Sequence, residues 1–179
     1  MIPQRARIRH AVKAALFNTT EAGERVAATR YVSWRPHQLP ALAIYTLEED
    51  IDPSSEDMAP RDLIRDLSLV IEAWAKPGEG VDDAMDLLSS QIESALHADP
   101  TFGGLVKDSI LDSTTMDVSV GGDMTVGLVR LFYRVTYVTD APEATDVADF
   151  NRATATHRFV GVPPDAVPSD GPFNVRTDP

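Results

Sequence analysis

The feature that most constrains the fold is the segment 125–139, where apolar side chains occupy alternate positions. Successive side chains of a strand point to opposite faces of a sheet, so the pattern predicts a long strand. We expect one face to pack on helices and the other, which carries arginines, to meet another surface such as a second subunit. The first face has Val129, Leu131, Tyr133, Val135 and Tyr137, and the second has Arg130, Phe132, Arg134, Thr136 and Val138.

Shorter patterns predict the partners of this strand. Residues 106–120 favour a strand with Met116, Val118 and Val120 on one face, and the following Gly121-Gly122-Asp123 is typical of a hairpin turn. Residues 41–47 are apolar enough for a mostly buried strand, and residues 25–33 suggest a short one. Residues 65–75 alternate as a strand does, although a helical stripe also fits them; we interpret them as a strand.

Two segments have helical periodicity. In residues 4–18, Ile8, Val12, Ala15 and Leu16 recur at helical spacing, and in residues 81–98 a wide apolar face follows Asp82 and Asp83. Acidic residues stabilise the positive N-terminal end of a helix, which accounts for this pair better than acid–base chemistry does.

The predicted elements form one α+β domain, residues 1–139, with one mostly antiparallel β-sheet and two helices packed on one face. Residues 140–179 are rich in proline and lack a sustained period, and only Arg158–Val162 looks like a strand. We interpret them as an extended C-terminal arm. Ordering such an arm is costly unless it docks on something.

Charge is unevenly distributed along the chain. The formal net charge is −12, yet residues 1–35 hold seven basic residues against two acidic ones. The acidic remainder would repel a phosphate backbone, so tight nucleic-acid binding is not expected. The basic N-terminal segment, with Arg5, Arg7 and Arg9, either meets the acidic surface of a neighbouring copy or lines the solvent face of a helix.

The patterns of known catalytic, cofactor and metal sites are missing. The chain has no cysteine, which excludes disulfides, thiolate metal sites and a cysteine nucleophile. Its histidines, at positions 10, 37, 97 and 157, are too scattered for a helical metal pair, and no phosphate-binding loop or nucleophile elbow is present. The sequence therefore predicts no enzyme, no cofactor and no metal ligand.

Two further segments contain residue types that occur in binding sites. Asp50–Arg61 begins like a calcium loop but has Ser55 where a glycine is needed and Arg61 where a glutamate is needed. An acidic solvated loop, here Glu48–Pro60, explains it better than a cation held between subunits. Trp34 and Arg35 lie in a proline-containing loop and are candidate interface anchors, because Trp and Arg are enriched at binding hot spots.

Three stretches together resemble one family. Leu39-Pro40-Ala41-Leu42-Ala43-Ile44-Tyr45 looks like the entry strand of the tail terminator (minor tail protein U-like) proteins of long-tailed bacteriophages. The turn Asp99-Pro100-Thr101-Phe102-Gly103-Gly104-Leu105 and the strand Arg130–Tyr137 are similar to the turn and final strand of that family. The resemblance covers about residues 4–139, and the segment after Asp140 is longer than the family leads us to expect.

The resemblance implies a structural virion protein. Such proteins form a hexameric ring that caps the tail tube, stops its polymerisation and offers a surface to the head–tail connector or stopper protein. DNA passes through the ring without specific binding, which an acidic lumen would favour. Assembly in the host cytoplasm, a virion location in the tail or neck and the absence of a membrane span are expected. Residues 140–179 are compatible with a flexible tail and with a contractile tail. In a contractile tail the arm would hold the sheath.

Other functions fit parts of the same pattern. A head–tail stopper is also a ring, and only a terminator should block tube elongation. A small hydrolase would need acidic residues that converge in a cleft. An adaptor outside phages is supported only by the lack of catalytic motifs.

Overall fold

A computed structural model describes residues 2–52, 62–75, 78, 80–121 and 124–140, all within one compact unit of residues 1–141. The predicted arm, with Arg158–Val162, lies outside the described residues, as does most of the calcium-like segment. The sheet, the helices and their contacts all belong to these residues.

The centre of the fold is a five-stranded sheet of β1 (Val26–Ala27), β2 (Ala41–Ile51), β3 (Leu63–Trp74), β4 (Asp108–Gly121) and β5 (Met124–Thr139). The strand order is β1-β2-β3-β5-β4. The β1–β2 pair is parallel and the three other pairs are antiparallel. The predicted α+β class with a mostly antiparallel sheet is confirmed.

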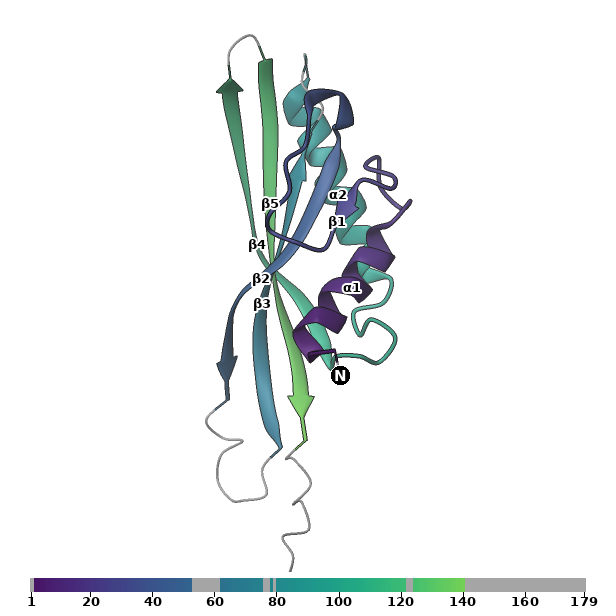
Figure 1. Cartoon of the computed structure of the whole chain (residues 1–179), viewed down its shortest axis with the longest axis vertical. Helices are drawn as coiled ribbons and strands as arrows, with labels where there is room; N and C mark the ends of the chain where they lie inside the picture. The colour runs from purple at the N-terminus through teal and green to yellow at the C-terminus, as the bar shows by residue number, and fades with distance from the viewer. Residues whose placement is uncertain (1, 53–61, 76–77, 79, 122–123, 141–179) are drawn as a thin grey trace, which may run out of the picture. The chain divides into compact units, whose positions relative to one another are not determined.

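Both helices, α1 (Gln4–Leu16) and α2 (Val81–His97), cover the same face of the sheet (Figure 1). A short 3-10 helix, η1 (Pro36–Gln38), precedes β2. Asp82 and Asp83 stand in the first turn of α2, as predicted. α1 lies beside β2 and α2 beside β5, so in the described part of the chain the outermost strand β4 adjoins a helix only near its start, where it faces the end of α2.

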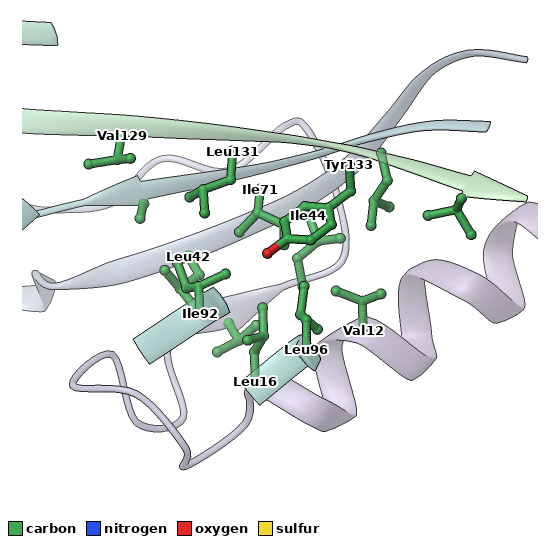
Figure 2. Close-up of a cluster of buried hydrophobic side chains, with 14 of the residues drawn as sticks. Val12, Leu16, Leu42, Ile44, Ile71, Ile92, Leu96, Val129, Leu131 and Tyr133 are labelled. Carbon is green, nitrogen blue, oxygen red and sulfur yellow. The ribbon is translucent and has the colours of Figure 1, made fainter. Parts of the chain in front are cut away.

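The core lies between this helical layer and the sheet (Figure 2). Removing each large apolar side chain from water contributes about 1.5–3 kcal/mol, so this layer supplies most of the driving force for folding. The predicted inward face of β5 is buried from Val129 to Tyr137, which confirms the alternation. The labelled core residues are Val12, Leu16, Leu42, Ile44, Ile71, Ile92, Leu96, Val129, Leu131 and Tyr133.

The fold settles the ambiguous periodicity of residues 65–75. Residues 63–74 are a strand, so the helical alternative for this segment is wrong. Leu67, Leu69 and Ile71 point into the core, and Val70 is buried on the other face. Burial of both faces explains why the sequence fitted two periodicities.

Several predicted boundaries are wrong. β1 stops at Ala27, so most of the predicted strand 25–33 is irregular, and α1 ends at Leu16 because Phe17 is extended and Asn18 has a positive φ of 59°. The predicted acidic loop does not begin at Glu48, because β2 continues to Ile51. Acidic residues have a low preference for strands. This end of β2 is stabilised by Glu49, which accepts hydrogen bonds from β3 and β5.

Candidate assembly surface

Strand β4 is the outer edge of the sheet and is exposed over most of its length. Within the described residues it pairs with β5 alone, and the side chains from 112 to 118 are exposed. Ile110 is 49%, Met116 48% and Val118 40% exposed. A long edge strand with exposed apolar side chains is a template for pairing with another chain. We call the strand with its exposed side chains the β4 surface.

A groove of about 550 Å³ adjoins the β4 surface on the helical side. Leu96 and His97 of α2 form one wall, and Leu111 and Tyr133 belong to the strands beneath. Glu93 and Asp108 add negative charge to its rim. Burial, and then the charge of Glu93, raise the pKa of Tyr133 to about 12, so the hydroxyl stays protonated as a hydrogen-bond donor.

The two arginines predicted as an interface on β5 lie on the helix-free face, but each has a partner within the sheet. Arg130 Nε lies 2.8 Å from Oε1 of Glu72, which also accepts a hydrogen bond of 3.0 Å from the Tyr45 hydroxyl. The hydrogen bond to Glu72 raises the pKa of Arg130. Arg134 Nη2 lies 2.9 Å from Oδ1 of Asp112, and both side chains are about half exposed. Arg134 is therefore the more accessible of the two.

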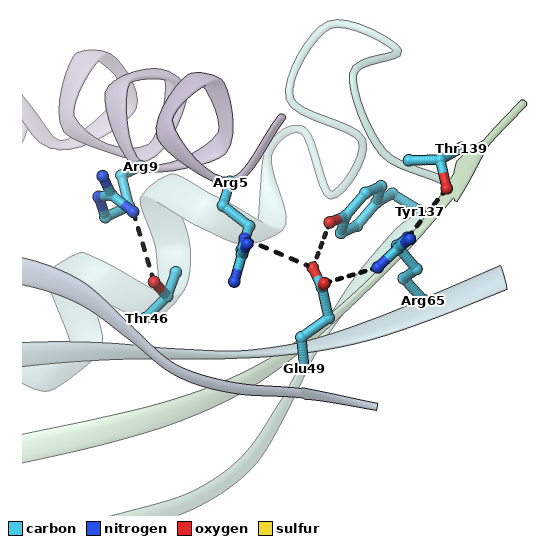
Figure 3. A network of polar contacts seen from close by, with 7 residues as sticks. All are labelled: Arg5, Arg9, Thr46, Glu49, Arg65, Tyr137 and Thr139. Atoms are coloured by element: carbon cyan, nitrogen blue, oxygen red, sulfur yellow. Dashed lines mark hydrogen bonds and ion pairs between the residues drawn. The ribbon is translucent and has the colours of Figure 1, made fainter. Parts of the chain in front are cut away.

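The three arginines of α1 make different contacts, and Figure 3 shows those of Arg5 and Arg9. Arg5 Nε lies 3.9 Å from Oε1 of Glu49, and Arg9 donates a hydrogen bond of 3.3 Å to the Thr46 hydroxyl. Arg7 is exposed and donates a hydrogen bond to Gln4 of its own helix. The structure thus separates Arg7, which faces solvent, from Arg5 and Arg9, which lean toward β2.

Glu49 joins three elements of the fold, and no pattern in the sequence indicates this role. Its carboxylate, 11% exposed, lies 2.8 Å from Nη1 of Arg65 and accepts a hydrogen bond from the Tyr137 hydroxyl. Arg65 also donates a hydrogen bond of 2.9 Å to the hydroxyl of Thr139, the last residue of β5. The pairing of β2 with β3 and of β3 with β5 brings these residues together (Figure 3).

The loop before β2 carries the other two predicted interface residues. The Trp34 side chain is half-buried, and its indole Nε1 is buried with no hydrogen-bond partner among the described residues. Arg35 is exposed, and its backbone N–H donates to Oε1 of Gln38. Close by in sequence, Arg30 stacks 4.6 Å from the ring centre of Tyr45 and donates to the carbonyl of Thr46. These contacts anchor the start of the loop on β2.

No described group of three or more His, Asp or Glu side chains is arranged to hold a metal ion. His10, His37 and His97 are exposed, and His157 lies outside the described residues. The helices described here are too short or too polar to cross a membrane. Searches with known protein-family models and against curated proteins found no match for this chain.

Proposed function

We propose that this chain is a non-enzymatic virion protein that caps the tail tube of a bacteriophage as a hexameric ring. The tube protein, the head–tail connector or stopper and further copies of the chain are its partners. The observation that carries the proposal is the β4 surface, which leaves one strand of a folded domain exposed at its edge with three apolar side chains half open to water. Such a surface is expected where subunits meet.

Two more observations support a ring. A closed ring requires a heterologous contact, in which one surface of a copy meets a different surface of the next. The exposed side of α1, with Arg7 and His10, is basic, whereas the β4 surface has acidic residues at Asp108, Asp112 and Asp117. The resemblance of residues 4–139 to tail terminators is the reason for proposing that the ring caps the tail tube.

The first test is the mass of the purified chain in solution, with and without the tube protein. We expect a hexamer, or a monomer that becomes a hexamer on the tube. The second test adds the chain to polymerising tube protein and measures tube length by electron microscopy. Terminated tubes support the proposal, whereas tubes that continue to grow past bound rings favour a stopper. A chain that stays monomeric and ignores the tube protein refutes both.

A further inference from the structure

Strand β4, from Asp108 to Gly121, has no proline and no basic side chain, two features that proteins use to block the pairing of an edge strand with another strand. A bulge between Leu111 and Ser113 interrupts the first part only, so the strand from Ser113 onward is regular. An edge of this kind can accept an additional strand through main-chain hydrogen bonds. Its charged side chains are all acidic: Asp108, Asp112 and Asp117.

One stretch of the C-terminal arm has only basic charged side chains, whereas those of β4 are acidic. Residues 150–162 contain no proline and no acidic residue, in a chain whose net charge is −12. They include Arg152, His157 and Arg158, and they end at Pro163 and Pro164. The stretch ends in the strand-like Arg158–Val162, and threonine, which favours strands, occurs twice before it. In length the stretch is close to β4, which covers residues 108–121.

We propose that residues 150–162 of one copy add as a further strand to the free edge of β4 in a neighbouring copy. This inference rests on the proposed ring. Each copy of the chain carries both the donor segment and the acceptor edge, and that is the pair of different surfaces that a head-to-tail contact needs. Because the donor and the acceptor belong to the same chain, each copy in a closed ring gives one arm and receives one.

The faces on which the charged side chains lie agree with pairing, although the two acidic residues stand eight ladder positions apart and the two arginines six. Asp108 lies opposite Thr136 and Asp117 opposite Leu128, at positions of β5 that share a face. Arg152 and Arg158 also share a face, because an even number of positions separates them. Cross-strand pairs of opposite charge stabilise a sheet, so in one register one arginine of the arm would lie directly opposite an acidic residue of β4, with the other arginine on the same face.

The arm starts at a suitable place. β5 ends at Thr139, and Thr136 pairs with Asp108, so the chain leaves the sheet at the end where β4 begins. Residues 140–149 can span roughly 33 Å when extended, which exceeds several strand spacings of about 4.8 Å. The arm can therefore reach past its own β4 to an adjacent copy.

The absence of cysteine allows a direct test with the full-length chain. One protein carries Thr115→Cys, which is exposed on β4 opposite Arg130. A second protein, with a mass tag, carries Thr154→Cys, Thr156→Cys or Val160→Cys, positions that share a face with the two arginines. The two proteins are mixed, assembled into rings and oxidised. A matched control replaces Thr115→Cys by Ser90→Cys, which is exposed on α2 away from the edge.

We expect disulfide-linked heterodimers between Thr115→Cys and at least one arm position, and at least tenfold fewer with the Ser90→Cys control. Equal yields with the control would overturn the inference. The inference would also be overturned if the disulfide formed only within a single chain that carries both substitutions. The arm would then cover the β4 edge of its own copy.

Charge exchange gives an independent measurement. Asp117→Arg and Arg158→Asp should each weaken association roughly fivefold, and the double variant should restore it. Rings that cap the tube but show neither cross-links nor rescue would refute the arm contact and leave the proposed function intact. Cross-linked rings that fail to cap the tube would retain the contact and refute the function.

Discussion

Gly127 of β5 lies so close to Met85 of α2 that a Cβ at position 127 would stand 2.7 Å from the Met85 sulfur. The same Cβ would lie 2.7 Å from Cγ2 of Val81, a stiff side chain that has little freedom to move aside. Because residue 127 has no side chain, the start of α2 can pack closely against the sheet.

Gly127→Ala should lower the free energy of unfolding by about 1–3 kcal/mol, because overpacking forces the helix and strand apart. Urea denaturation measures the change. The loss should shrink in a Met85→Ala background, as a double-mutant cycle would reveal. Thr114→Ala, at an exposed position of β4, is the control and should change stability little. Equal losses in the two backgrounds would mean that Met85 is not the obstacle.

The carboxylate of Glu49 should contribute more to stability than that of Asp112. Glu49→Gln keeps the shape but weakens the bonds to Arg65 and Tyr137, and we expect a loss of about 1–3 kcal/mol in the free energy of unfolding. Asp112→Asn is the matched control. Its partner Arg134 is half exposed, so the loss should stay below about 1 kcal/mol. Urea titrations at pH 7 compare the two, and similar losses would contradict the ranking.

Two tyrosines should make the fold sensitive to alkaline pH. Burial raises the pKa of Tyr133 and of Tyr137 to about 12, from a usual value of 10.0, and the hydrogen bond to Glu49 adds to the effect at Tyr137. The unfolded chain releases these protons near pH 10 while the folded chain keeps them. Their contribution to stability is therefore complete below pH 10 and is lost as the pH rises toward 12.

Urea midpoints measured between pH 9 and pH 11.5 should fall in the upper part of this range. Tyr133→Phe and Tyr137→Phe should each flatten that decline, because phenylalanine has no proton to lose. Each variant is compared with its own midpoint at pH 8, which separates the proton effect from a lost hydrogen bond. An unchanged slope in both variants would assign the alkaline sensitivity to other groups.

Reversing the charge of Arg7 should weaken a ring without weakening the subunit. Arg7 is exposed and its hydrogen-bond partner, Gln4, lies on the same helix, so Arg7→Glu should leave the urea midpoint nearly unchanged. If the basic segment meets an acidic neighbour, association should weaken roughly fivefold or more at low salt. Light scattering over a concentration series measures this.

Arg5→Glu and Arg9→Glu serve as comparisons for Arg7→Glu. Both side chains bond toward β2, so these two changes should lower the stability of the subunit as well. The loss of association in Arg7→Glu should diminish as salt is added, because exposed charges are screened. A hexamer that Arg7→Glu leaves unchanged would exclude the contact through α1.

Periodicity in the sequence was enough to predict β5, α2 and the layer in which they pack. Val129 to Tyr137 alternate cleanly because only one face of β5 meets helices, and Leu88, Ile92 and Leu96 recur at helical spacing for the same reason. β3 was ambiguous because Val70 is buried on the face opposite Leu69 and Ile71.

Features that depend on distant partners were beyond prediction from the sequence. Glu49 holds Arg65 and Tyr137 only after β2, β3 and β5 have paired, and nothing near Glu49 in the chain indicates this. The side of α1 that faces β2 decides which arginines contact the sheet, as Arg5 and Arg9 do, and which face solvent, as Arg7 does. Met116 and Val118 were expected on one face of a strand, but their exposure follows from the position of β4 outside the helical layer.

The central place of β5 has a mechanical consequence. The strand is 16 residues long, bonded to β3 on one side and to β4 on the other, and residues 140–179 continue from its end. A force that is transmitted along β5 loads both rows of hydrogen bonds in shear at once. Bonds loaded together share the force, whereas bonds peeled from an edge fail one after another. A subunit pulled by its C-terminal segment should therefore resist extension through its whole sheet.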